Sequence, residues 1–358
     1  MGPPSALTRL LSSARPGAFR LFLAFAVLVS HSSRFNLGSW AVYTFFVLSG
    51  YWIHRMWSDK YAGAAHPVRL FYGSRLLRIL PLFWLVNLGA CALLAAGLQP
   101  AYAGPPVASW GGLRSAAVNV LLLGYAELPL PQRALGVAWS LDVELQFYLA
   151  FPLLLYLCTR GRLGKYVLAT IIVLGAAGLA AFLIPSDEGP TYLASFGLFF
   201  LAGAAAAHRD WTPGPRLAAL SALVTAAIVA ACWCSPMGRL LFENGKHGAV
   251  EAYLHYQRSA QVALAVVTIP FALRTVRIPS GPRDRQLGEL SFTLYLAHWP
   301  IMMVHTRYFE QLPPLQRIPS LAVAWAAVAL LSWLLLRYFD QPLERWRRRW
   351  VAARLPAA

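Results

Sequence analysis

The sequence predicts an all-α membrane protein, because it is rich in apolar residues, poor in charge, and built from apolar runs that recur from end to end. Of its 358 residues, 58% are hydrophobic and 13% are charged, whereas a soluble domain carries about twice that charge fraction. The mean hydropathy is +0.53. The runs approach the length of about 20 residues that an α-helix needs to cross the hydrocarbon core. Helices are expected because lipid offers the backbone no other hydrogen-bond partners.

We predict about ten membrane-spanning helices within one membrane domain, residues 1–358, with a core at 17–345 and a short basic tail at 346–358. The predicted spans are 19–36, 38–54, 79–98, 139–157, 166–184, 191–208, 216–235, 260–276, 287–306 and 319–339. A further apolar piece at 115–126 is too short to span comfortably, and we predict that it is re-entrant or interfacial.

The positions of the basic residues predict that both termini are cytoplasmic. With 115–126 not crossing, 23 of the 31 Lys and Arg residues fall on the cytoplasmic side, as the positive-inside rule requires. The segments that carry them are 1–20, 54–78, 158–165, 208–216, 274–286 and 337–358. This rule accounts for the net charge of +17, and we expect no basic block interleaved with solvent-exposed aromatics, as nucleic-acid binding would need. A basic cytoplasmic face would attract anionic lipid and anionic cofactors.

The four cysteines have neither metal-ligand nor CxxC spacing, so we expect no metal site and no redox role. They are Cys91, Cys158, Cys232 and Cys234.

The first predicted span carries a polar pair in the stretch "RLFLAFAVLVSH". Arg20 and His31 are eleven residues apart, which is three helical turns plus roughly 20°, so both project from one face about 16 Å apart. A polar side chain at the depth of His31 marks a functional site or hydrogen-bonds to a neighbouring helix. Neutral imidazole can take a proton near pH 7, as activation of a hydroxyl acceptor requires.

Two arginines and one carboxylate extend this candidate site. Arg75 and Arg78, in "SRLLRILPLFW", share a helix face at i, i+3 and could grip phosphates from the cytoplasm, or simply anchor the helix. In "VAWSLDVELQFYLAFP", Ser140, Glu144 and Tyr148 are placed to face inward. Glu144 could orient the imidazole of His31, or form a structural ion pair with an arginine.

Three further residues are candidates for the cavity wall. Tyr295 and His298 share a face in "LGELSFTLYLAHWPIM", where His298 is either part of a polar cavity or a packing histidine. Ser49, in "FFVLSGYWI", belongs with Gly50 to a small-residue notch that would admit a helix or a ligand.

Taken together, five of these stretches resemble the acyltransferase-3 family of bacterial membrane O-acyltransferases over residues 17–345, ending in "YFDQPLER". They are "RLFLAFAVLVSH", "AVYTFFVLSGYWI", "SRLLRILPLFW", "WSLDVELQFY" and "SFTLYLAHWPI". The resemblance implies a ten-helix domain in the bacterial inner membrane. It would take an acyl group, usually acetyl from cytoplasmic acetyl-CoA, and deliver it to a hydroxyl of an extracytoplasmic polysaccharide or lipid-linked sugar.

The same resemblance assigns roles to individual residues. It implies that Arg20 and His31 form the family's Arg-x10-His pair, that Arg75 and Arg78 form its RxxR motif for the donor, and that Glu144 is its WSLxxE glutamate. The chain departs from the family at Tyr43, where an acidic residue is usual, and at "PGAF" before Arg20, where an Asp-Gly pair is common. These departures bear on substrate identity.

Two alternatives stay open at this point. The same polar residues could line the conduit of a transporter or flippase for lipid-linked saccharides, although no internal repeat is visible. A succinyl transferase would differ from an acetyl transferase only in the charge of its donor pocket.

Overall fold

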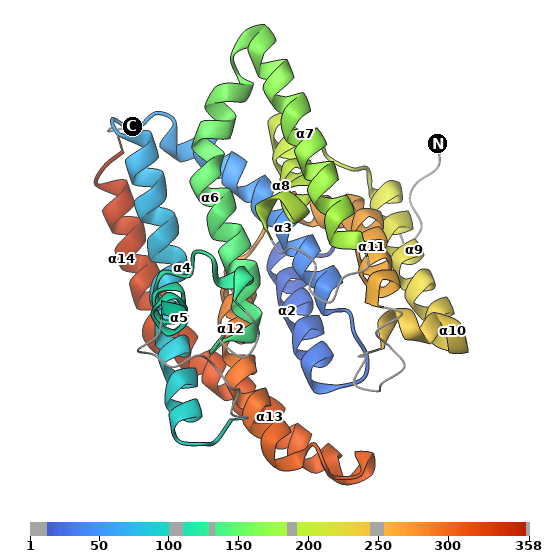
Figure 1. Ribbon diagram of the computed structural model, residues 1–358. Coiled ribbons are helices and arrows are strands. Elements are labelled where there is room, and N and C mark those ends of the chain that lie inside the picture. Colours follow the sequence, from blue (N-terminus) through green and yellow to red (C-terminus); the bar gives the residue numbers. More distant parts are fainter. Residues whose placement is uncertain (1–12, 100–109, 129–132, 185–191, 244–253, 356–358) are drawn as a thin grey trace. The chain divides into compact units, whose positions relative to one another are not determined.

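The computed structural model describes residues 13–99, 110–128, 133–184, 192–243 and 254–355, which are almost entirely helical (Figure 1). The part of the chain that it describes contains no β-strand, apart from one isolated bridge between Phe35 and Glu243. The main helices are α2 (Pro16–Ser32), α3 (Gly38–Met56), α4 (Pro67–Ala95), α5 (Trp110–Leu121), α6 (Trp139–Cys158), α7 (Gly161–Leu183), α8 (Leu193–His208), α9 (Pro215–Cys234), α10 (Pro236–Arg239), α11 (Leu254–Thr275), α12 (Pro282–Phe309), α13 (Pro314–Leu335) and α14 (Gln341–Ala352).

Each of the ten predicted spans overlaps a helix over most of its length, although the bounds differ. Among the residues that the structure describes, five helical stretches are long and apolar enough to cross a membrane. They are Pro67–Ala95, Gly136–Cys158, Gly161–Leu183, Pro215–Cys234 and Leu315–Ala352. These findings define an all-helical membrane protein, whereas the number of ten crossings and the cytoplasmic position of both termini stay predictions.

Residues 115–121 of the piece predicted at 115–126 lie in α5, which has 12 residues and is therefore about 18 Å long. This is shorter than the hydrocarbon core of about 30 Å. The helix stops because Leu122 and Gly124 adopt left-handed backbone angles, with φ of 67° and 83°. Its re-entrant or interfacial position stays a prediction.

Two helical segments differ from the sequence-based prediction. The α4 helix begins at Pro67, twelve residues before the predicted span, because proline is well suited to the first turn, where its missing N–H costs nothing. The basic tail is helical as far as Ala352, and a π-helical turn, η7 (Leu336–Asp340), joins α14 to α13. A second π-turn, η1 (Trp57–Tyr61), follows α3.

The chain forms two compact units, and each draws on separate parts of the sequence. The first contains residues up to Met56 together with Leu157–Ser291, and the second contains Trp57–Tyr156 together with the residues from Phe292 onward. The boundary therefore falls within α12.

In the first unit, α3 packs closely on α8 because two glycines face backbone. A Cβ atom on Gly50 would overlap the carbonyl oxygen of Phe200, and one on Gly203 would overlap that of Val47. The predicted notch at Ser49 and Gly50 thus admits a helix, as small residues do at membrane helix crossings.

Aromatic rings continue this contact along the two helices. Tyr43 stacks on Phe196 and Phe199, with ring centroids 5.2 and 5.3 Å apart. Phe46 stacks on Phe200 at 4.6 Å. Tyr43, the position at which the resembled family usually has an acid, is only 2% exposed, so here it is part of the apolar core.

In the second unit, α4 contacts α5 and runs beside α14 (Figure 1). The indole of Trp84 donates to the carbonyl of Val120 at 2.6 Å, which ties α5 to α4. At the other end of α4, Gly73 leaves room for the ring of Trp350 on α14.

Candidate active site

The α2 helix carries Arg20 and His31, and it is unbroken between them. The predicted common face and the separation of about 16 Å therefore hold. Both side chains are half-buried. The start of α2 is fixed by Asp284 of α12, whose carboxylate accepts hydrogen bonds from the backbone N–H groups of Gly17 and Ala18 at 3.1 and 2.9 Å.

The imidazole of His31 is oriented by its own helix. Its Nδ1 lies 3.0 Å from the carbonyl oxygen of Val27, one turn earlier. A carbonyl oxygen can only accept a hydrogen bond, so in the neutral ring Nδ1 carries the proton and Nε2 keeps its lone pair. This is the tautomer that a general base or a nitrogen nucleophile needs at Nε2.

In the second unit, α6 carries two carboxylates with different surroundings. Asp142 is fully buried and accepts hydrogen bonds from the N–H groups of Gly124 and Ala126 and from the amide of Gln146. It therefore holds the turn after α5. Glu144 is half-buried and accepts a hydrogen bond from Tyr148 at 2.5 Å.

The structure also brings Ser140 and Tyr295 together. Their hydroxyl oxygens lie 2.7 Å apart, and Tyr295 donates to the carbonyl of Val137 at 3.0 Å. Tyr295 is also within electrostatic range of Glu144. Four predicted residues thus form one polar group in this unit, namely Ser140, Glu144, Tyr148 and Tyr295.

His298 lies one turn beyond Tyr295 on α12 and is fully buried. Its Nδ1 lies 3.1 Å from the carbonyl oxygen of Leu294, so it repeats the arrangement found at His31. Its ring centroid is 6.0 Å from that of Tyr295. The neighbouring Trp299 fills the space beside Gly136, where a Cβ atom would overlap its ring.

Arg75 and Arg78, the two predicted arginines of α4, have different partners. Arg78 donates to both oxygens of Asp340 at 2.9 Å, and its guanidinium lies 4.8 Å from the ring centroid of Phe292. Arg75 is 5% exposed and donates to the hydroxyls of Tyr61 and Ser74 at 3.3 and 3.4 Å. Its Nε is buried and has no hydrogen-bond partner.

Five residues around these two arginines lie outside the predicted set, namely Tyr61, Ser74, Asp340, Glu344 and Arg347. Arg347 of α14 donates to the hydroxyl of Ser74 and to Glu344, and Tyr61 donates to Ser74 at 2.8 Å. Burial alone would raise the pKa of Tyr61, but the positive charges of Arg75 and Arg347 and the hydrogen bonds that Tyr61 makes with Ser74 and Arg75 outweigh it, so that the pKa is lowered. Asp340 and Glu344 lie in "YFDQPLER", the stretch that ends the family resemblance, whereas nothing in the sequence singled out Tyr61.

The predicted residues are divided between the two compact units. Arg20, His31 and Ser49 belong to the first unit, whereas the arginines of α4 and the polar group on α6 and α12 belong to the second. The predicted orientation of His31 by Glu144 therefore stays a prediction. Among the described residues, no group of three His, Cys, Asp or Glu side chains could hold a metal ion.

Comparison with known proteins identifies the class to which this helical membrane protein belongs. The family model described as "Acyltransferase domain" matches residues 12–337, which is nearly the whole chain. The chain therefore belongs to this acyltransferase family, and the resemblance seen in its motifs is confirmed.

One curated relative and the solved structures complete the comparison. The chain is 36% identical over 121 residues to "Acyltransferase MdmB" of Streptomyces mycarofaciens. That match covers 33% of this chain and 28% of the relative, so the chain spans less than a third of the length of the relative. No solved structure matches the chain significantly.

Proposed function

We propose that the protein is a membrane O-acyltransferase that moves an acetyl group from cytoplasmic acetyl-CoA to a hydroxyl of an extracytoplasmic polysaccharide or lipid-linked sugar, in the bacterial inner membrane. Membership of the acyltransferase family supports acyl transfer. The observation that carries the proposed chemistry is the contact between His31 Nδ1 and the carbonyl of Val27, which leaves Nε2 able to take a proton.

His31 can act in two ways. As a general base, Nε2 removes the proton of the sugar hydroxyl while that oxygen attacks the thioester carbonyl, and the CoA thiolate leaves and is protonated. As a relay, Nε2 itself attacks the thioester and releases CoA, and the hydroxyl then attacks the acyl-imidazole. Either route ends with an ester and free CoA thiol.

The remaining residues are proposed to position the two substrates. Arg75 offers a buried, unsatisfied Nε–H that would suit a phosphate oxygen of the donor. Arg78 is already hydrogen-bonded to Asp340, so we propose that it binds the acyl-CoA donor more weakly than Arg75 does. Arg20 would guide the donor along α2 towards His31, and Glu144 would stabilise the imidazolium.

The test is transfer of radiolabelled acetyl from acetyl-CoA by membranes that contain the protein, with release of CoA thiol followed in parallel. His31→Ala is expected to abolish both signals while the protein stays inserted. His305→Ala, also on a helix but outside the proposed site, is the matched control and is expected to keep activity. Normal thiol release by His31→Ala would overturn the proposed chemistry.

The same assay separates the two routes and a transport function. Label that stays on wild-type protein but not on His31→Ala supports the relay, and label on both argues against it. Movement of a lipid-linked sugar without any thiol release would show a transporter instead. Base-labile esters on surface polysaccharide, compared between a wild-type and a deletion strain, would identify the acceptor.

A further inference from the structure

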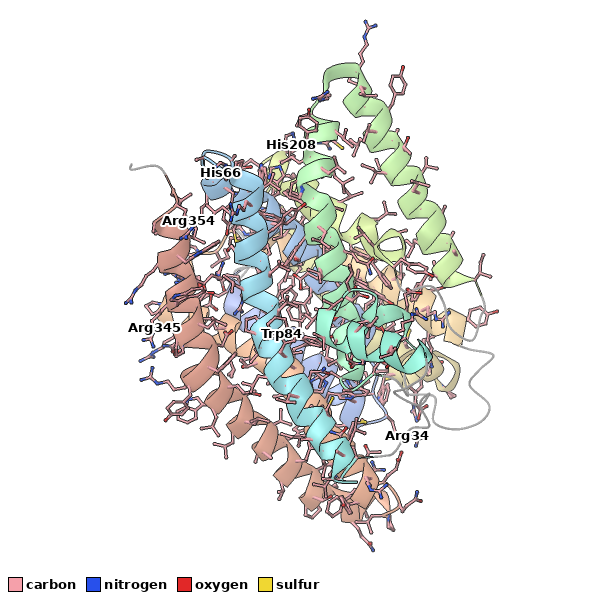
Figure 2. All side chains as sticks on the ribbon, turned by 60° about the vertical axis from the view of Figure 1, so that its left-hand side comes forward. Arg34, His66, Trp84, His208, Arg345 and Arg354 are labelled. Atoms are coloured by element: carbon pink, nitrogen blue, oxygen red, sulfur yellow. The ribbon has the colours of Figure 1, made fainter. Side chains whose placement is uncertain are left out.

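A basic cavity of about 610 Å³ opens where the start of α4 meets the end of α14, within the second unit. Figure 2 shows His66 and Arg354 at this same end of the helix pair. Three of the six lining residues carry basic groups and none carries a carboxylate. The lining residues are Ala65, His66, Arg69, Leu70, Trp350 and Arg354.

The wall formed by α14 is held in place by packing. A Cβ atom on Gly73 would lie 2.7 Å from the ring of Trp350, so glycine allows the indole to sit against α4. Arg354 donates to the carbonyl of Trp350 at 2.9 Å, and its guanidinium lies 4.5 Å from the ring centroid. Both contacts hold the guanidinium of Arg354 beside the cavity, although the residue as a whole is exposed.

The wall formed by α4 adds backbone donors. This helix begins at Pro67, and His66 before it provides no side-chain hydrogen bond to the first turn. The N–H groups of Val68 and Arg69 have no acceptor within a regular helix, and the helix dipole is positive at this end. Both features favour an anion next to the arginines.

Two other arginines between α4 and α14 have acidic partners, unlike the arginines of the cavity. Arg78 is paired with Asp340, and Arg347 with Glu344. Arg69 and Arg354 instead line a hollow that contains no acidic side chain. An anionic ligand would supply the negative charge that Asp340 and Glu344 supply to the other two arginines.

We propose that this cavity binds the phosphate group of an anionic ligand, with Arg69 and Arg354 as its charge partners and His66 as a further donor. One guanidinium can donate two parallel hydrogen bonds to phosphate oxygens. Two arginines on facing walls can therefore contact one phosphate from both sides. Such a group can come from the headgroup of an anionic lipid or from a soluble phosphate ester such as CoA. No residue of the proposed acyl-transfer site lines this cavity, so the proposal does not depend on that reaction.

The experiment uses the purified full chain and two probes. Native mass spectrometry measures phosphatidylglycerol retained in detergent, and calorimetry in phosphatidylcholine nanodiscs measures binding of CoA and of dephospho-CoA. The double variant Arg69→Gln with Arg354→Gln is expected to bind one or both probes about tenfold more weakly, since it loses two charge-assisted contacts. Arg345→Gln with Arg349→Gln removes the same charge from exposed positions of α14 and is the matched control.

The outcomes separate the two sources. A selective loss of phosphatidylglycerol identifies a lipid headgroup, and a selective loss of CoA identifies a soluble ester. Weaker binding of both probes supports a site that recognises the phosphate group whatever molecule carries it. The proposal is overturned if neither probe is affected, or if the control variant weakens binding equally, because the effect would then be net charge. Arg69→Gln alone keeps the contacts between Arg354 and Trp350 and is expected to show an intermediate loss.

Discussion

Arg78 donates to both carboxylate oxygens of Asp340 at 2.9 Å, across 262 positions of sequence. The side chain of Asp340 is 3% exposed and that of Arg78 is 20% exposed, so the pair is largely withdrawn from water. The contact joins α4 to the π-turn that precedes α14. It therefore fixes Arg75 and Arg78 relative to the C-terminal helix.

Removing both partners of this pair should destabilise the protein less than the sum of the two separate removals. Asp340→Asn leaves a buried guanidinium without its counter-charge, which costs about 3 kcal/mol. The double variant Arg78→Met with Asp340→Leu should lose less than the sum of the two single changes, as measured by thermal unfolding in detergent. Strictly additive losses would mean that the pair contributes no coupling.

The two carboxylates of α6 should respond oppositely to loss of charge. Asp142→Asn weakens the hydrogen bonds to Gly124 and Ala126 and should lower stability by about 1–3 kcal/mol. Glu144→Gln should leave the unfolding midpoint nearly unchanged but reduce acyl transfer. Each variant is the control for the other, and the assignment fails if Glu144→Gln unfolds early or keeps full activity.

Asp284 should make the stability of the protein depend on pH in the acid range. It lies at the start of α12, ahead of the predicted span 287–306. Burial alone would raise its pKa, but hydrogen bonds from Ser280 and from the N–H groups of Ala18 and Gly17 outweigh this and lower the pKa. Its contribution is therefore full above the ordinary Asp value of about 3.9 and is lost as the pH falls through the lowered value.

The measurement compares the unfolding midpoints of wild type and Asp284→Asn over a series of pH values. The wild type should be more stable near neutral pH, and the difference should shrink as the medium becomes strongly acidic. If the difference in unfolding midpoint stays constant down to acid pH, the effect of Asp284 comes from the packing of its side chain and not from its charge.

The crossing of α3 and α8 should not tolerate a methyl group at its centre. Gly50→Ala places a Cβ atom against the backbone of Phe200, which cannot move aside as a side chain can, and should cost about 1–3 kcal/mol. Gly197→Ala, on α8 itself, meets nothing within 4 Å and should stabilise the helix by up to about 1 kcal/mol. Equal effects at the two positions would contradict the close packing.

The sequence predicted the helices well because apolar length is a local property. Each of the ten predicted spans overlaps a helix, and the common face of Arg20 and His31 followed from spacing alone. The contact of His31 with Val27 is also local, since the two residues are four apart. The sequence predicted less well where the pattern is polar, as at the early start of α4 and in the helical tail.

Contacts between distant segments could not be predicted in this way. Nothing local indicates that Arg78 meets Asp340 or that Gly17 meets Asp284, since more than 260 residues separate each pair. The role of Tyr61 depends on a π-turn that brings its hydroxyl to Ser74, and no sequence pattern predicted that turn. Tyr43 shows the same limit, because stacking partners on another helix decide its surroundings.

The π-turn at Leu336–Asp340 determines which side chains of α14 face α4. Such a turn accommodates one residue more than an α-helical turn, and each residue rotates an α-helix by about 100°. Deleting a single residue there would leave the composition of α14 unchanged but swing Arg347 and Trp350 away from α4. The number of residues in the π-turn, and not their charge, thus decides whether the C-terminal arginines contact α4.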